Sequence, residues 1–108
     1  MEEDMKKTIN IGGTDVLFKA NARTVDILLD DFGVDIIADF QKIDFQSTAG
    51  LRIVKKLAYV MAEQAHSTGD LSYEDWLESF DVFPAQAFTD IVNLWAASME
   101  TSSVAKNG

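Results

Sequence analysis

Two adjacent glycines limit the fold of this chain more than any other residues. Gly12 and Gly13 separate two short runs in which apolar residues alternate with polar ones. Because consecutive glycines accept the positive φ angles of a tight two-residue turn, the segment is predicted to form a β-hairpin in which Ile11 pairs with Thr14. This register places four apolar side chains on one face and Leu17 on the other: Ile9, Ile11, Val16 and Phe18. An isolated hairpin is unstable in water, so the apolar face must pack on the segments that follow.

The rest of the chain repeats apolar residues at helical spacing and predicts about five helices. Asn21 suits the N-cap of a first helix over residues 22–32, which Gly33 ends. Asp35 then suits the cap of a short second helix. The side chains expected to point inward from this second helix are Ile36, Ile37 and Phe40, with Ile43 as a further candidate.

The longest predicted helix opens at Ser47 or Thr48 and ends near His66. Its apolar face is so broad that more than one neighbouring element must bury it. The predicted core side carries Leu51, Val54, Leu57, Ala58, Met61 and Ala65, widened by Ile53 and Val60. The opposite side carries Arg52, Lys56, Tyr59 and Glu63.

Two shorter patterns complete the predicted fold. Residues 72–75 resemble a capping box that opens a fourth helix, with Tyr73, Trp76, Leu77 and Phe80 on one face. Pro84 suits the first turn of a fifth helix, whose apolar stripe is Phe88, Ile91, Val92, Trp95 and Met99. We therefore expect a mainly α (α+β) fold, in which an N-terminal β-hairpin packs on a bundle of about five helices. A single domain is expected over residues 1–100, followed by a disordered tail over residues 101–108.

Composition limits the classes of function. Asp and Glu number 18 against 9 Lys and Arg, giving a net charge of −9. This balance argues against nucleic-acid binding, which requires clustered positive charge, and it favours a basic partner. The absence of cysteine excludes disulfides, thiolate metal sites and cysteine nucleophiles. No apolar run is long enough to span a membrane, and the charged N-terminus does not predict a secretion signal, so a cytoplasmic protein is expected.

The sequence predicts no catalytic, cofactor or metal site. The only histidine, His66, lies at a predicted helix end, where the helix dipole favours a cation. No Gly-x-Ser-x-Gly nucleophile motif occurs. A group of aspartates lacks the spacing of a calcium loop and is interpreted as a solvated acidic face: Asp26, Asp30, Asp31, Asp35 and Asp39. We therefore expect a protein that is not an enzyme.

Aromatic and basic residues are the candidates for partner binding. Trp76 and Trp95 fall on apolar stripes, which favours core packing, although Trp is also enriched at binding hot spots. Arg52, Lys55 and Lys56 form a small basic cluster, either a solubilising face or a contact with acidic residues of a neighbouring copy. The predicted partner-binding residues are Trp76, Phe80, Phe88, Trp95, Arg52 and Lys56.

The order of these features resembles the tail assembly chaperones of long-tailed bacteriophages and prophages. The resemblance covers residues 8–97 and depends on the pattern, without a single signature motif. Its parts are the Ile-x-Ile-Gly-Gly hairpin at Ile9–Gly13, Asn21-Ala-Arg23-Thr, Phe32-Gly33-Val-Asp35, Ala58-Tyr-Val-Met61-Ala, the Leu71–Leu77 segment and a final amphipathic helix with Trp95.

This resemblance implies a small helical protein that binds the hydrophobic tape measure protein and keeps it soluble until tail tube subunits replace it. Such chaperones commonly oligomerise, and many are also made in a longer, frameshifted form. An acidic adaptor or carrier, or a DNA mimic that binds a basic partner, is an alternative with the same composition. A carrier would need a helix-start Ser preceded by Asp, whereas Ser47 and Ser72 follow Gln46 and Leu71.

Overall fold

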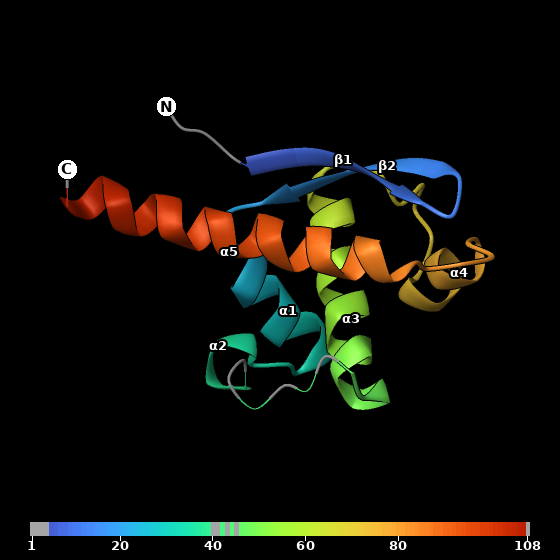
Figure 1. Cartoon of the computed structure of the whole chain (residues 1–108), viewed down its shortest axis with the longest axis horizontal. Helices are drawn as coiled ribbons and strands as arrows, with labels where there is room; N and C mark the ends of the chain where they lie inside the picture. Colours follow the sequence, from blue (N-terminus) through green and yellow to red (C-terminus); the bar gives the residue numbers. More distant parts are fainter. Residues whose placement is uncertain (1–4, 40–41, 43, 45, 108) are drawn as a thin grey trace.

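The computed structural model describes residues 5–39, 42, 44 and 46–107, with side chains up to Met99. The elements follow one another as β1 (Met5–Ile11), β2 (Thr14–Ala20), α1 (Thr24–Phe32), α2 (Ile36–Asp39), α3 (Thr48–Gln64), α4 (Tyr73–Glu78) and α5 (Ala85–Asn107). The hairpin lies across one end of α3, and α5 runs beside the hairpin (Figure 1). β2 packs on α3 and β1 packs on α5, while α1 covers another side of α3. The predicted α+β arrangement of an N-terminal hairpin on five helices is confirmed.

The hairpin has the predicted register. Ile11 pairs with Thr14 and Ile9 with Val16, in an antiparallel two-stranded sheet. The predicted apolar face is buried against the helices, and Leu17, on the other face, is 37% exposed. Gly12 and Gly13 have φ angles of +59° and +98°, as the tight turn requires. The Asn10 side-chain oxygen accepts a hydrogen bond from the Gly13 amide at 2.9 Å, which reinforces the turn.

The first helix begins later than the sequence pattern predicts, because Asn21 takes part in a turn that precedes it. Asn21 Oδ1 accepts the Arg23 amide at 2.9 Å, and α1 then starts at Thr24. Thr24, which is fully buried, donates to Gln64 Oε1 at 2.6 Å, and Gln64 Nε2 donates to Asn21 Oδ1 at 2.8 Å. This polar network ties the start of α1 to the end of α3.

The short second helix is only partly as predicted. The Asp35 side chain caps it, accepting the Ala38 amide at 3.0 Å. Ile36 is buried, but Ile37 is 51% exposed, so its predicted inward orientation is wrong. Consecutive residues of a helix are about 100° apart around its axis, and Ile36 is the residue of α2 that is buried. Phe40 and Ile43 lie outside the described residues.

Helix α3 is the central element of the core. Ser47, one of the two residues predicted to open the helix, is its N-cap and accepts the Gly50 amide at 3.0 Å. The helix ends at Gln64, and His66 follows in a left-handed conformation with φ of 59°. Tyr59 was predicted on the polar side but is buried. Tyr73 and Trp76 of α4 cover that side, each with its ring centroid 5.6 Å from that of Tyr59.

The last helix is the longest and extends beyond its predicted end. Its buried side chains include Ile91 and Trp95, as predicted, whereas Met99 is 42% exposed. The backbone is helical through residues 101–107, where the composition predicts a disordered tail. No Gly or Pro precedes Gly108 in this segment, so nothing in the sequence forces the helix to stop.

A row of aromatic rings connects α4 with α5. Centroid distances are 5.0 Å for Trp76–Phe80, 6.2 Å for Phe80–Phe83 and 4.9 Å for Phe83–Phe88. Such edge-on and tilted contacts stabilise ring pairs beyond the area that they bury. The link between the two helices is therefore held by its own side chains.

Candidate partner-binding grooves

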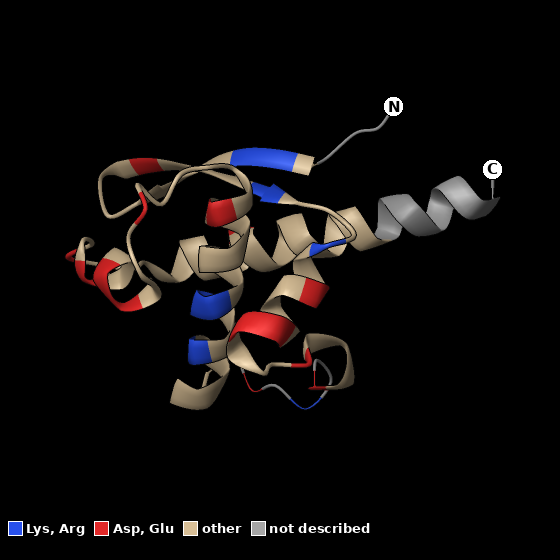
Figure 2. Ribbon diagram, turned by 180° about the vertical axis from the view of Figure 1, so that it is seen from behind, with Lys and Arg blue, Asp and Glu red and all other residues tan. Residues whose placement is uncertain are grey.

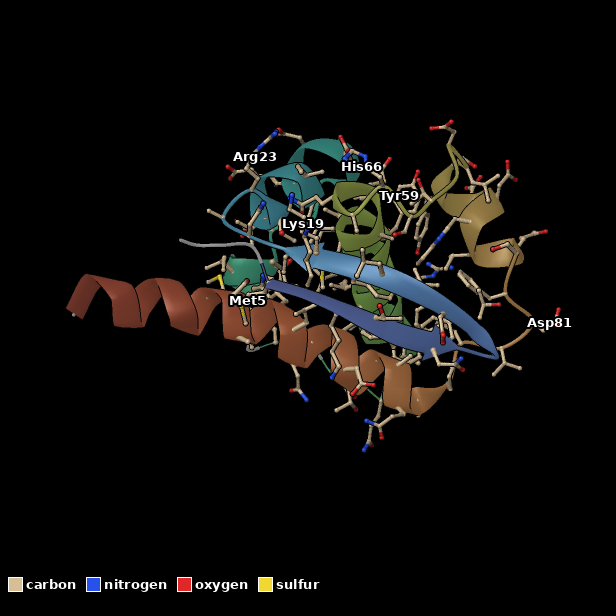
Figure 3. The ribbon with its side chains drawn as sticks, turned by 90° about the horizontal axis from the view of Figure 1, so that it is seen from above. Met5, Lys19, Arg23, Tyr59, His66 and Asp81 are labelled. Carbon is tan, nitrogen blue, oxygen red and sulfur yellow. The ribbon has the colours of Figure 1, made fainter. Side chains whose placement is uncertain are left out.

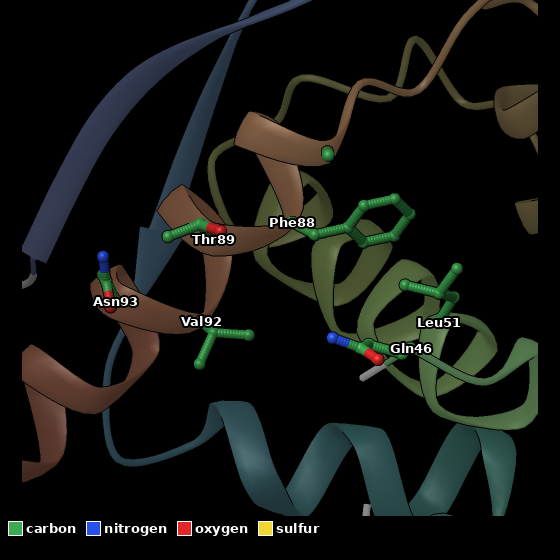
Figure 4. A pocket seen from close by; sticks show the side chains of 7 residues that line it. Gln46, Leu51, Phe88, Thr89, Val92 and Asn93 are labelled. Carbon is green, nitrogen blue, oxygen red and sulfur yellow. The ribbon is translucent and has the colours of Figure 1, made fainter. Parts of the chain in front are cut away.

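One candidate site is a groove of about 440 Å³ between the start of α3 and the first half of α5 (Figure 4). We call it the α3–α5 groove, and it is lined by Gln46, Leu51, Ala85, Phe88, Thr89, Val92 and Asn93. Phe88 extends from α5 toward Leu51 of α3, and Val92 lies one helical turn further along α5 (Figure 4). These three side chains are half-buried.

The polar residues of the α3–α5 groove are uncharged. Gln46, Thr89 and Asn93 provide amides and a hydroxyl, and no Asp, Glu, Lys or Arg is among the described residues that line it. A groove of this kind can accept the apolar face of an amphipathic helix, with its polar side chains at the rim as hydrogen-bonding groups.

A second groove, of about 430 Å³, lies between the hairpin and α4. We call it the β2–α4 groove. Its walls are one strand, the loop after α3, and α4: Thr14, Asp15, Val16, Leu17, Ser67, Thr68, Gly69, Leu71, Trp76, Ser79 and Phe80. Leu17 is 37% and Leu71 39% exposed, and Phe80 is half-buried. The apolar surface of this groove is therefore open to solvent.

Tyr59 fixes one wall of the β2–α4 groove. Its hydroxyl donates to the Leu71 carbonyl at 2.6 Å and so holds the loop against α3. Burial, with a further contribution from the charge of Glu63, raises the pKa of Tyr59 to about 12. The pKa of Tyr73, in contact with it, is also raised by burial. Both phenols therefore stay protonated, and able to donate, throughout the neutral range.

The six predicted partner-binding residues do not form one surface. Phe88 lines the α3–α5 groove, and Phe80 lines the β2–α4 groove. Trp76 and Trp95 are core residues, 2% and 4% exposed, although Trp76 contributes to the floor of the β2–α4 groove.

The two predicted basic residues lie outside both grooves. Arg52 is exposed and Lys56 is half-buried. The Lys56 ammonium lies 5.8 Å from the centroid of the Phe32 ring, a cation–π geometry that gives this residue a structural contact.

The sequence patterns missed four groove residues. Leu51 and Val92 were assigned to the core, because helical spacing does not distinguish a buried position from one beside a groove. Leu17 and Leu71 did carry a signal: Leu17 is apolar on the predicted solvent face of the hairpin, and Leu71 lies in a turn segment. Large apolar residues in such places are candidates for binding surfaces.

Neither groove brings metal ligands together. Among the described residues, no three His, Asp or Glu side chains are grouped closely enough to hold an ion. Asp26, Asp30 and Asp31 are exposed on α1. Within the same described part of the chain, no helix is both long enough and apolar enough to cross a membrane.

Comparisons with models of protein families, with curated proteins and with solved structures give no match.

Proposed function

We propose that this protein is a phage tail assembly chaperone, a non-enzymatic protein that binds the tape measure protein in the host cytoplasm and keeps it soluble. The observation that carries this proposal is the α3–α5 groove, which presents Leu51, Phe88 and Val92 between two helices. The tape measure protein is long and helical, so its apolar stripe is a ligand of the shape that such a groove accepts.

The charge of the molecule supports the same function. A chaperone that covers an apolar chain has to supply the solubility that its client lacks. The net charge of −9 provides this through mutual repulsion of the coated complexes. The uncharged lining of the α3–α5 groove then allows an apolar helix face to enter without burying an unpaired charge.

Co-expression with the tape measure protein encoded in the same gene cluster tests the proposal. We expect the wild-type chain to bring the tape measure protein into the soluble fraction as a complex. Val92→Asp places a charge in the α3–α5 groove and is expected to abolish the complex. The matched control is Leu29→Asp, which changes an exposed leucine of α1 outside both grooves. Equal rescue by wild type and Val92→Asp, with both folded by circular dichroism, would reject the groove as the site.

Self-association and contact with the tail tube protein belong to the same proposal. Sedimentation velocity over a range of concentrations tests the first, and co-purification with the tube protein tests the second. A chain that stays monomeric, and that leaves the tape measure protein insoluble, would contradict the chaperone function altogether.

An acidic carrier is the less favoured alternative because of how the helix-start serines are used. The Ser47 hydroxyl donates to the Asp44 carbonyl while it accepts the Gly50 amide. The Ser72 hydroxyl accepts the Asp75 amide at 3.2 Å. Both hydroxyls are therefore engaged as caps, and we expect no added mass after expression with a phosphopantetheinyl transferase. A DNA mimic would instead bind a basic nucleic-acid enzyme and release it at moderate salt.

A further inference from the structure

The outer edge of β2 has backbone groups that the hairpin does not use. In an antiparallel pair, hydrogen-bonded and non-hydrogen-bonded residue pairs alternate along the strands. Ile11 and Thr14 flank the two-residue turn and form a hydrogen-bonded pair, so Asp15 and Leu17 belong to non-hydrogen-bonded pairs. Their amide N–H and C=O groups therefore point away from β1.

This edge is open in the part of the chain that the structure describes. No backbone hydrogen bond joins Asp15 or Leu17 to the described loops and helices beside them. The β2–α4 groove runs along the same edge and is lined by both residues. Proteins commonly protect an edge strand with Pro, Lys or a covering element, yet position 17 carries an exposed leucine.

The segment that forms the wall opposite this edge carries several acidic residues beside those that line the groove. Residues 67–81 contain no Lys or Arg, and their acidic residues are Asp70, Glu74, Asp75, Glu78 and Asp81. All of these carboxylates are exposed, as is Asp15 on the strand itself. Figure 2 shows acidic residues near the turn of the hairpin and around α4, whereas the basic residues of the hairpin, Lys19 of β2 among them, lie on the parts of the strands away from the turn. The charged residues of the groove lining and of segment 67–81 are thus all acidic.

We propose that β2 accepts a third strand from a partner protein, supplied by an extended segment in which apolar residues alternate with Lys or Arg. Its backbone would pair with the free groups of Asp15 and Leu17. Since side chains of a strand alternate between faces, one set would enter the groove against Leu71 and Phe80, and the other would lie on the exposed face. There the aliphatic part of a Lys covers Leu17 while its ammonium reaches the acidic rim.

This inference goes beyond the chaperone function and uses a different surface. The α3–α5 groove has an uncharged lining and is proposed to take a helix, whereas the β2–α4 groove has Asp15 in its lining, lies beside the acidic segment 67–81 and borders a strand edge. Figure 3 shows β2 between β1 and the helical side of the molecule, with the edge opposite β1 directed toward the loop after α3. If the binding predicted for one groove is not observed, the binding predicted for the other groove can still be tested.

The probe is a short capped peptide in which Val and Lys alternate, added to the full chain and followed by amide hydrogen exchange. We expect the Asp15 and Leu17 amides to become protected in the complex. The Val16 amide, which already bonds across the hairpin, should change little. This alternation separates strand pairing from general shielding of the surface.

Two altered peptides identify the source of the affinity. N-methylation of the residues that face β2 removes their backbone donors, and we expect binding to weaken about tenfold or more. Replacing Lys by Glu reverses the charge and should abolish binding at low salt. An N-methylated peptide that binds as well as the parent would overturn the proposal.

Proline variants test the edge from the side of the protein. Leu17→Pro removes an outward N–H that the hairpin does not use, and Thr8→Pro is the matched change in its partner on β1. We expect Leu17→Pro to abolish peptide binding and Thr8→Pro to leave it unchanged. Asp15→Lys keeps the backbone N–H groups intact and should also weaken peptide binding. It replaces Leu17→Pro as the test if that variant does not fold. A peptide that binds as a helix, or Asp15 and Leu17 amides protected by self-association without peptide, would overturn the proposal.

Discussion

At the scale of single residues, Gly12 has two roles in one position. Its φ of +59° is left-handed, and a Cβ added there would lie 2.7 Å from the Val82 carbonyl oxygen. Gly33, with φ of +68°, has the same type of backbone but open space around it. Alanine substitutions at Gly12 and Gly33 therefore separate the cost of a strained backbone from the cost of the close contact with the Val82 carbonyl oxygen.

We predict that Gly33→Ala lowers the free energy of unfolding by about 1 kcal/mol, the cost of a left-handed alanine. Gly12→Ala should cost about 1–3 kcal/mol more, because the link before α5 must move away from the turn. Urea unfolding of both variants measures the difference. Equal losses would mean that the hairpin turn and Val82 are not in close contact.

Tyr59 makes stability depend on pH in the alkaline range. A tyrosine in the unfolded chain titrates near 10, whereas the folded pKa is about 12. The folded chain holds the Tyr59 proton more tightly than the unfolded chain, so the protonated phenol stabilises the folded state. This contribution to the free energy of unfolding is complete below pH 10 and is lost as pH rises toward 12. We predict that Tyr59→Phe shows a shallower loss of stability between pH 10 and 12.

The same variant should be less stable at neutral pH by about 1 kcal/mol, because the bond to the Leu71 carbonyl is gone. Unfolding by urea at a series of pH values gives both quantities. Tyr73 also has a raised pKa and remains in the variant, so part of the pH dependence should persist. Identical slopes for wild type and variant would contradict the assignment to Tyr59.

At the scale of elements, the N-cap of α3 is the clearest local determinant. Ser47→Ala leaves the Gly50 amide without its side-chain acceptor, and we predict a loss of about 1 kcal/mol in the free energy of unfolding. The control is Thr48→Ala, an exposed position in the first turn, which should change stability by less than about 0.5 kcal/mol. Thermal unfolding of the two variants checks the contrast.

Local patterns predicted the elements well where one physical rule decides the outcome. The hairpin register follows from the two-residue period of a strand and the turn at Gly12, so all four residues predicted to face the core are buried. Caps at Asp35, Ser47 and Ser72 were correct because a side-chain acceptor satisfies a nearby amide.

Long-range packing decided the elements that the patterns missed. Tyr59 is buried because α4 folds back onto α3, and α1 starts late because Gln64 binds Asn21 from 43 positions away. Neither contact leaves a trace in the local sequence. The two grooves are likewise products of tertiary arrangement, so the sequence identified Phe80 and Phe88 as candidates but could not assign them to separate sites.

At the scale of the whole molecule, the domain boundary remains a prediction. The last buried side chains described on α5 are Leu94, Trp95 and Ser98, and Met99 is already exposed. We predict that a chain ending at residue 100 keeps its free energy of unfolding within about 0.5 kcal/mol. A chain ending at residue 93 should lose several kcal/mol, about the cost of deleting a buried Trp. Chemical denaturation of both truncations locates the boundary, and a large loss in the first would move it into residues 101–108.

The row of rings from Phe80 through Phe83 to Phe88 joins a wall of one groove to a wall of the other. Phe80 borders one groove and Phe88 the other, so we expect a ligand that displaces either ring to disturb the contact of that ring with Phe83. Any resulting change in affinity must be reciprocal: the factor by which a helical ligand alters strand binding equals the factor in the opposite direction. Binding of a ligand in one groove would then change the affinity of the other groove for its own ligand, through the contacts of the three phenylalanines.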